Sequence, residues 1–148
     1  MNKAIGEVIE LARGESTKSG VSVKTQFAES LPAVTGDRTQ LQQVILNLIL
    51  NAVQAMSEGG LPLRELQIGT EANGSDGVLI SIRDSGPGIR PENLDRLFDP
   101  FYTTKSAGMG MGLAICRSIV EVHGGRIWAT ANIPRGAAFH FTLPAAAE

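Results

Sequence analysis

The chain has 148 residues, which is the size of one compact domain with a single hydrophobic core. Its formal net charge of −2 comes from 13 Lys and Arg against 15 Asp and Glu, with no long block of one sign, which argues against nucleic acid or an anionic membrane surface as a partner. The single cysteine, Cys116, excludes an internal disulfide, and no apolar run reaches the ~18 residues of a membrane span, so we expect a soluble domain in a reducing compartment such as the cytoplasm, without direct membrane contact.

The first part of the chain predicts two helices around one strand. Apolar residues at helical spacing, with a glycine at the end, predict a helix over residues 1–14. Alternating apolar and polar residues predict a half-buried strand over residues 21–27. Asp37 and Gln40 have the spacing of a capping box, and the stretch 41–56 that follows contains neither Pro nor Gly, so it predicts the longest helix.

The second part of the chain predicts a hairpin, two helices and two further strands. The segments are strands over 66–72 and 78–83, a short helix over 92–97, a helix over 113–123 that Gly124 and Gly125 end, and strands over 126–131 and 137–143. Residues 144–148 read as a tail. The order predicts one α/β two-layer sandwich over residues 1–148, with helices packed on one face of a mixed β-sheet.

Three amide side chains share one face of the longest predicted helix. Gln43, Asn47 and Asn51 recur every four residues on a helix that is otherwise apolar almost all round, and buried amides are costly unless they are hydrogen-bonded. One interpretation is an amide ladder satisfied by backbone groups or buried water. The other is a set of neutral oxygen ligands for Mg²⁺, which keeps water and phosphate oxygens as most of its ligands.

Asp84 ends the second hairpin strand and is followed closely by Gly86 and Gly88. Glycines leave room for a ligand to lie against the backbone, and a carboxylate beside them can accept a hydrogen bond from the exocyclic amine of adenine. The alternative is an ordinary tight turn, since Asp followed by Ser-Gly-Pro-Gly is also the sequence of an Asx-turn. This motif alone leaves both interpretations open.

Alternating glycines stand at the start of the last predicted helix. Gly108, Gly110 and Gly112 allow the backbone to wrap around an anion, and the unpaired N–H groups of the helix start, up to Leu113, can bind phosphate oxygens. Lys105 can supply a positive charge to the terminal phosphate. The alternatives are a surface loop for the glycines and a solvated side chain for the lysine.

In their order and separation these segments resemble four nucleotide-binding boxes of the ATP-binding superfamily that joins histidine kinases with gyrase, mismatch-repair ATPases and a heat-shock chaperone. Residues 43–52 resemble its N box, 84–88 its G1 box, 97–105 its F box and 108–113 its G2 box. The closing Phe-Thr-Leu-Pro is similar to the end of histidine-kinase domains of the nitrogen- and oxygen-sensing type. The resemblance covers nearly the whole chain and implies the Bergerat fold.

The resemblance also implies a role for each box, with ATP and Mg²⁺ as cofactors. Asn51 would coordinate Mg²⁺, Asn47 would help to hold the phosphates or the metal, and Asp84 would bond the adenine amino group. Residues 99–109 would form the ATP lid, within a segment 97–112 that contains the F box, the lid and the G2 box.

Asn47 favours phosphoryl transfer over hydrolysis. ATP-hydrolysing relatives carry at this position a glutamate that activates water, whereas an amide has no useful basicity. The resemblance therefore implies transfer of the γ-phosphoryl group by positioning, as in the catalytic domain of a sensor histidine kinase, which phosphorylates a histidine on a separate dimerisation domain in two-component signalling. A serine or protein kinase of the same superfamily, or a nucleotide sensor without enzymatic activity, is the alternative.

The accepting histidine is not in the setting that this family gives it. His123 lies near a helix end and His140 in an alternating strand, so we expect both to be structural and the dimerisation domain to be absent from this chain. The chain alone is then expected to be a monomer, with a cognate response regulator downstream, in the cytoplasm or in the cytoplasmic part of a membrane-anchored sensor. Ala137 and Ala138 stand where relatives often have a threonine that shares the adenine contact through water, which leaves open whether that contact is replaced.

Overall fold

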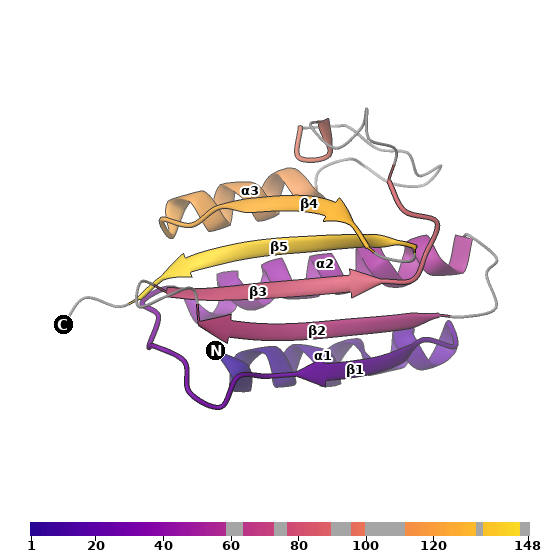
Figure 1. Cartoon of the computed structure of the whole chain (residues 1–148), viewed down its shortest axis with the longest axis horizontal. Coiled ribbons are helices and arrows are strands. Elements are labelled where there is room, and N and C mark those ends of the chain that lie inside the picture. Colours follow the sequence, from indigo (N-terminus) through magenta and orange to yellow (C-terminus); the bar gives the residue numbers. More distant parts are fainter. Residues whose placement is uncertain (59–63, 73–76, 90–95, 100–111, 133–134, 146–148) are drawn as a thin grey trace.

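The computed structural model describes residues 1–58, 64–72, 77–89, 96–99, 112–132 and 135–145. In these residues three α-helices and five strands follow one another in the predicted order (Figure 1). They are α1 (Asn2–Lys18), β1 (Ser22–Gln26), α2 (Arg38–Glu58), β2 (Glu65–Ala72), β3 (Gly77–Asp84), α3 (Gly112–Val122), β4 (Ile127–Ala131) and β5 (Ala137–Pro144). The short helix predicted over 92–97 lies almost wholly outside the described residues, and no described helix is long and apolar enough to cross a membrane.

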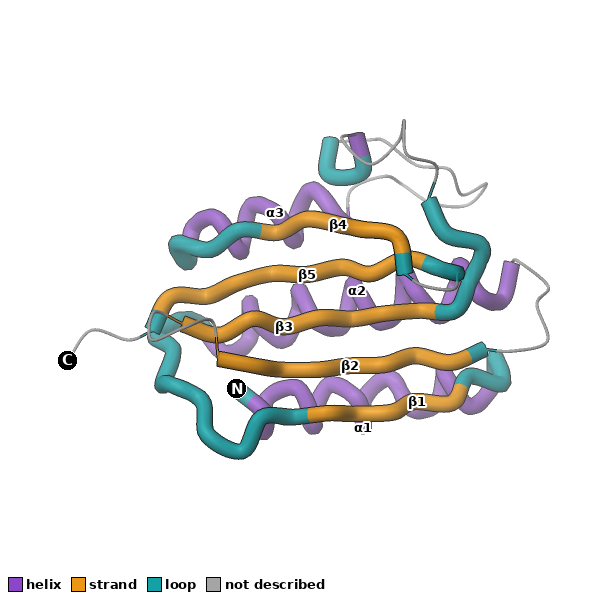
Figure 2. Tube along the Cα trace, in the orientation of Figure 1, coloured by secondary structure: helices purple, strands orange, loops and turns teal. Residues whose placement is uncertain are grey.

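The five strands form one mixed sheet in the order β1-β2-β3-β5-β4. β1 runs parallel to β2, and the other neighbouring pairs are antiparallel. All three helices lie behind the sheet, on one face of it (Figures 1 and 2). The predicted two-layer α/β architecture, with helices on one face of a mixed sheet, is therefore confirmed.

The hydrophobic core fills the space between the sheet and the helices. The inward side chains of β2 and β3, Leu66, Ile68, Ile80 and Ile82, are at most 1% exposed. They meet the apolar side of α2, on which residues such as Leu48 are completely buried. Each such side chain contributes about 1.5–3 kcal/mol on burial, so α2 is held mainly by its sheet-facing side.

The N-terminal helix is longer than the sequence predicted. The prediction ended the helix at Gly14, but α1 continues to Lys18. The glycine that follows its end is Gly20, which has a left-handed φ of 69°. Ala12 and Ser16, one turn apart, are both buried, so the inward face of the helix continues past Gly14. Nothing lies within 4 Å of the position of a Cβ at Gly14, and a single exposed glycine costs a helix only about 1 kcal/mol.

Helix α2 is capped at its start by Asp37, as predicted, but only half of the predicted capping box forms. Oδ1 of Asp37 accepts the backbone N–H of Gln40 at 3.0 Å. The backbone N–H of Asp37 donates to Nε2 of His123 at 3.0 Å instead of to the Gln40 side chain. A Cβ at Gly36 would lie 2.4 Å from the His123 ring, so this histidine fits closely against the entry to α2 and joins it to the end of α3.

Candidate functional site

Asp84 ends β3, a strand that is paired on both sides, and the residue is only 3% exposed. Its Oδ1 accepts the backbone N–H of Gly86 at 2.9 Å and that of Ala137 at 3.1 Å. The first bond closes the Asx-turn that the sequence offered as the ordinary interpretation, and the second joins this turn to the start of β5. No hydrogen bond from the described residues reaches Oδ2, so the turn and a ligand can use different oxygens of one carboxylate.

Burial dominates the electrostatics of Asp84. Loss of water around the carboxyl raises its pKa above the ordinary aspartate value, and the N–H groups of Gly86 and Ala137 partly oppose that rise. A ligand that donates a hydrogen bond to Oδ2 would favour the ionised carboxylate.

Residues between β4 and β5 donate hydrogen bonds to the turn after Asp84. Nδ2 of Asn132 donates to the carbonyl oxygen of Asp84 at 2.8 Å, and Nε of Arg135 donates to the carbonyl oxygen of Gly86 at 3.3 Å. Gly136 has a φ of 102°, and a Cβ there would lie 1.9 Å from the same Asp84 carbonyl oxygen. Asn132, Arg135 and Gly136 were not among the predicted site residues. Gly136, between two predicted strands, was the one available signal.

Gly86 and Gly88 both pack closely against other parts of the chain. Gly88 has a φ of 87°, which favours glycine, and a Cβ there would lie 3.2 Å from the Gly136 carbonyl oxygen. A Cβ at Gly86 would lie 3.1 Å from Oδ1 of Asp84 and 3.3 Å from Cγ of Met56. That a ligand also lies close to these two glycines stays a prediction.

The amide face of α2 is oriented away from the sheet. Gln43 is exposed, while Asn47 and Asn51 are half-buried. The side chain of Asn47 interacts with the thiol of Cys116 on α3, and this thiol also points to the carbonyl oxygen of Val44 at 3.8 Å. Asn47 therefore lies beside α3, whereas Gln43 faces solvent.

Cys116 is an inert packing group. It is completely buried, and this burial raises the pKa of its thiol to about 11, although the Asn47 side chain acts in the opposite direction. The thiol is therefore neutral near pH 7.

The described residues include only the two ends of the segment 97–112. Leu97 and Phe98 are each 8% exposed, and the Phe98 ring meets that of Phe139 on β5 edge to face, with centroids 6.2 Å apart. At the other end α3 begins at Gly112, one residue before the start of the helix predicted over 113–123, and Leu113 packs against the core. The candidate phosphate-binding residues between them, Lys105, Gly108 and Gly110, lie outside the described residues.

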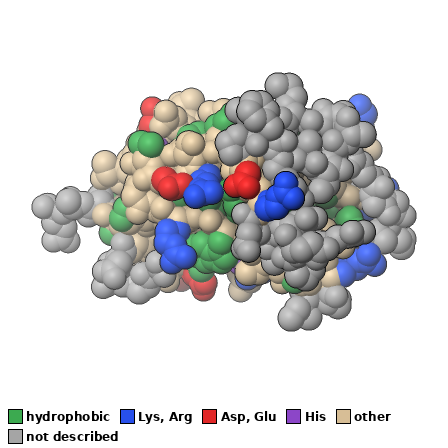
Figure 3. Space-filling view, turned by 90° about the horizontal axis from the view of Figure 1, so that it is seen from above, with side chains coloured by type: hydrophobic (Ala, Val, Ile, Leu, Met, Phe, Trp, Pro, Cys, Tyr) green, Lys and Arg blue, Asp and Glu red, His purple; other side chains and the backbone are tan. Residues whose placement is uncertain are grey.

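α3 also carries charged side chains of both signs on its outer side. Nε of Arg117 pairs with Oε1 of Glu121 at 2.8 Å. Seen from above, acidic and basic side chains stand next to each other on this side of the molecule (Figure 3). The part of this surface that the structure describes is thus a mixed-sign surface.

Both histidines are engaged inside the protein. Nδ1 of His123 donates to the carbonyl oxygen of Ile119 at 2.8 Å, while Nε2 accepts from Asp37. His140 is buried and bonded to Ser81 at 2.8 Å and Thr130 at 3.0 Å. All four ring nitrogens have protein partners, which agrees with the structural roles expected for both residues.

The fold, together with the glycine-containing turn after Asp84, defines the class of this chain as a nucleotide-binding α/β domain. Comparison with protein families makes this specific: residues 36–147 match the family described as "Histidine kinase-, DNA gyrase B-, and HSP90-like ATPase". The chain belongs to this family.

Known relatives agree with this assignment. The chain is 40% identical over 95% of its length to the sensor histidine kinase TmoS of Ectopseudomonas mendocina, and 39% identical over its full length to the sensor protein FixL of Bradyrhizobium diazoefficiens. It spans only 14% of TmoS and 29% of FixL.

Among solved structures, the catalytic domain of the histidine kinase ThkA superimposes with a TM-score of 0.83, at 36% identity, over 97% of this chain and 92% of that domain. ThkA has also been solved in complex with the response regulator protein TrrA. The chain thus has the fold of a histidine kinase catalytic domain.

Proposed function

We propose that this chain binds ATP with Mg²⁺ and transfers the γ-phosphoryl group to a histidine on a separate dimerisation domain of a sensor histidine kinase. The proposal rests on the different surroundings of the two carboxylate oxygens of Asp84. Oδ1 accepts the two N–H groups that hold the turn, while Oδ2 accepts no hydrogen bond from the described residues. The family match and the likeness to ThkA support the same function.

At the base end of the site, Oδ2 of Asp84 would accept a hydrogen bond from the exocyclic amine of adenine. Guanine carries a carbonyl oxygen at the corresponding ring position, which would face the carboxylate as a second acceptor. The buried carboxylate therefore favours ATP over GTP, because an unmatched polar contact in a buried site is costly. Gly86 and Gly88 contribute by shaping the turn that holds Asp84.

At the phosphate end, the donor set fits Mg²⁺ with ATP. Asn51 offers a neutral, hard oxygen ligand on the half-buried face of α2, and the phosphates would supply the negative charge that Mg²⁺ prefers. When bound, Mg²⁺ neutralises charge on the phosphate oxygens. Asn47 and Lys105 would hold the transferred phosphate, and the backbone of Gly108, Gly110, Gly112 and Leu113 would donate N–H groups to the phosphate oxygens.

The amide at Asn47 makes transfer the favoured reaction, since it cannot take a proton from water. Residues 1–148 would act as one catalytic domain in which residues 99–109, within the segment 97–112, form the ATP lid, with the accepting histidine and a response regulator as further partners. The complex of ThkA with TrrA supports the second of these partners. We place the domain in the cytoplasm, on its own or as part of a membrane-anchored sensor.

Calorimetric titration with a non-hydrolysable ATP analogue, with and without Mg²⁺, tests the site. Asp84→Asn and Asn51→Ala should each weaken binding at least tenfold, or about 1.4 kcal/mol. Gln43→Ala is the matched control, because Gln43 lies on the same face of α2 but is exposed. Unchanged affinity in both site variants would show that the nucleotide binds elsewhere.

The reaction is tested by adding a histidine-containing dimerisation domain and Mg²⁺ with ATP. Phosphohistidine on the added domain is the expected product. Transfer to a protein serine without that domain would instead indicate a serine kinase, and intact binding without any transfer would indicate a nucleotide sensor.

A further inference from the structure

Ser85, between Asp84 and Gly86, contacts two other elements of the fold. We infer that Ser85 is a positioning residue: together with Met56 it fixes the turn after Asp84 to α2, so that the base-binding carboxylate and the metal-binding amide of Asn51 keep one spacing. The inference rests on the nucleotide site proposed above.

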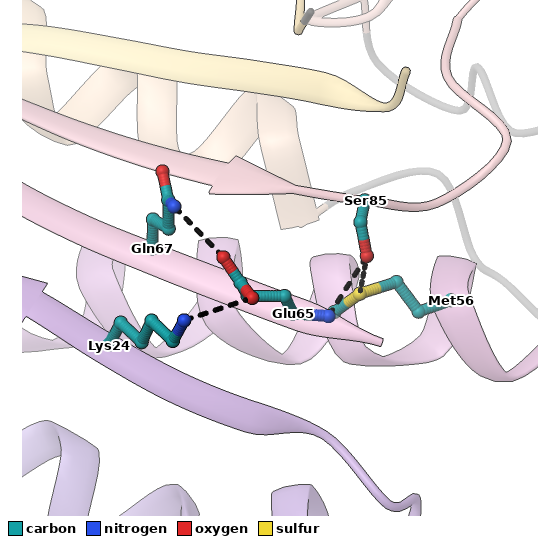
Figure 4. Close-up of polar contacts among 5 residues, drawn as sticks. All are labelled: Lys24, Met56, Glu65, Gln67 and Ser85. Atoms are coloured by element: carbon teal, nitrogen blue, oxygen red, sulfur yellow. Dashed lines mark hydrogen bonds and ion pairs between the residues drawn. The ribbon is translucent and has the colours of Figure 1, made fainter. Parts of the chain in front are cut away.

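Two contacts of the Ser85 hydroxyl with other elements of the fold are drawn in Figure 4. Its Oγ accepts the backbone N–H of Glu65 at 2.9 Å and donates toward Sδ of Met56 at 3.7 Å. Glu65 is the first residue of β2, and Met56 lies near the end of α2. One hydroxyl thus joins the end of β3 to the neighbouring strand and to the helix behind the sheet.

The side chain of Met56 also packs against the turn after Asp84. It is completely buried, and its Cγ would lie 3.3 Å from a Cβ at Gly86. An unbranched thioether adapts to an irregular space such as this one. Ser85 and Gly86 therefore rest on the same side chain of α2.

The contact of Ser85 and Gly86 with Met56 matters because the proposed ligand binds both to the turn after Asp84 and to α2. At 1.5 Å per residue, Asn51 lies about 7–8 Å from Met56 along the helix axis. A nucleotide whose base is on Asp84 and whose metal is on Asn51 is held at both ends, so a shift of the turn relative to α2 weakens the two contacts jointly.

The carboxylate of Glu65 is directed away from this contact. It accepts from Nε2 of Gln67 at 2.9 Å and pairs with Nζ of Lys24 at 3.3 Å (Figure 4). Only the backbone of Glu65 takes part in the contact with Ser85. Glu65→Ala is therefore a matched control that keeps the N–H donor.

The experiment measures the affinity of the full chain for a non-hydrolysable ATP analogue in Mg²⁺ and in a chelator. Ser85→Ala should weaken binding in Mg²⁺ by about tenfold, as expected for a lost bond at a binding site. It should weaken binding in the chelator less, so the gain in affinity from Mg²⁺ falls. Ser85→Thr, which keeps a hydroxyl, and Glu65→Ala should stay within about twofold of the unchanged protein.

A purely structural role would lower the melting temperature of Ser85→Ala and leave the gain from Mg²⁺ unchanged, and this result would overturn the inference. If Ser85→Ala does not fold, Met56→Leu serves instead, since it keeps the volume and removes the sulfur acceptor; the same loss of the Mg²⁺ effect is expected, and an unchanged effect counts against the inference. Loss of binding in Asp84→Asn and Asn51→Ala together with normal binding in Ser85→Ala would overturn this inference alone. Normal binding in all three would overturn the proposed site itself.

Discussion

Ala137 and Asp84 are joined by a hydrogen bond of 3.1 Å from a backbone N–H to a side-chain oxygen. The donor belongs to the main chain, so the bond does not depend on which side chain stands at position 137. Ala137, which stands where relatives often have threonine, therefore still donates its backbone N–H to the Asp84 carboxylate. The bond also makes the two oxygens of Asp84 unequal, and this difference can be tested by substitution.

We expect Asp84→Asn to fold normally and to lose nucleotide binding. The asparagine oxygen can accept the N–H groups of Gly86 and Ala137, while its NH₂ group would replace Oδ2 and meet the adenine amine as a second donor. Asp84→Ala leaves both N–H groups without their acceptor, which should also cost about 1–3 kcal/mol of stability. Denaturant unfolding and titration of both variants separate the two effects; an equal loss of stability in both would contradict the assignment of the oxygens.

The raised pKa of Asp84 predicts a pH dependence of stability. The folded state holds the proton of Asp84 more tightly than the unfolded state. The contribution of Asp84 to the free energy of unfolding therefore decreases as pH rises from the ordinary aspartate range through the raised pKa, and is restored as pH falls. Compared with Asp84→Asn, the unchanged protein should gain stability on acidification from pH about 7 to about 4; a parallel pH profile for the two proteins would refute this.

Acidification should have the opposite effect on the nucleotide. A ligand that donates to Oδ2 favours the ionised carboxylate, so affinity for the ATP analogue should fall as Asp84 takes up its proton. Titration at several pH values measures this fall. Glu71→Gln, which removes an exposed carboxylate of β2, should show the same fall as the unchanged protein.

Gly136→Ala should both destabilise the fold and weaken nucleotide binding. The new Cβ would lie 1.9 Å from the Asp84 carbonyl oxygen, at a φ of 102° that disfavours any side chain. Gly14→Ala is the opposite case, because it lies within α1 with nothing near its Cβ position; it should raise stability by up to about 1 kcal/mol. Melting temperatures of the two variants should therefore move in opposite directions, and a shift in the same direction would be inconsistent with the geometry of one of these glycines.

His123→Ala should destabilise the protein without affecting the nucleotide. It removes the acceptor for the Asp37 N–H and the ring that packs against Gly36, for which we expect about 1–3 kcal/mol. Val122→Ala is the matched control, because Val122 is 82% exposed and should change stability by less than about 0.5 kcal/mol. Equal unfolding midpoints for the two variants would rule out the role given to His123.

The elements of this fold follow from patterns that are local in sequence. Apolar and polar alternation predicted β1, and the stretch without Gly or Pro predicted α2. The end of α1 was wrong because Gly14 looks like a stop, whereas the buried Ser16 shows that the packed face continues beyond it. Local patterns identify periodicity well, and they do not show where tertiary burial extends an element.

The candidate site was predictable only in part for the same reason. Asp84 stood out because it precedes two glycines, but the Asn132 amide that holds its carbonyl oxygen is 48 positions away. The predicted capping box failed in a similar way, since the N–H of Asp37 donates to a histidine 86 positions away. Every residue has a backbone carbonyl group and nearly every residue an N–H group. The residue type at a position therefore does not show which distant side chain its backbone will bond.

The position of Asp84 at the end of a doubly paired strand also determines how slowly its surroundings exchange with solvent. The amide protons of Gly86 and Ala137 point at a buried oxygen, so they can be replaced by deuterium only when their hydrogen bonds to Asp84 open. Slow exchange at these two amides in the free protein would mean that the base end of the proposed site is already formed before a nucleotide arrives. Binding there would then require little loss of chain entropy.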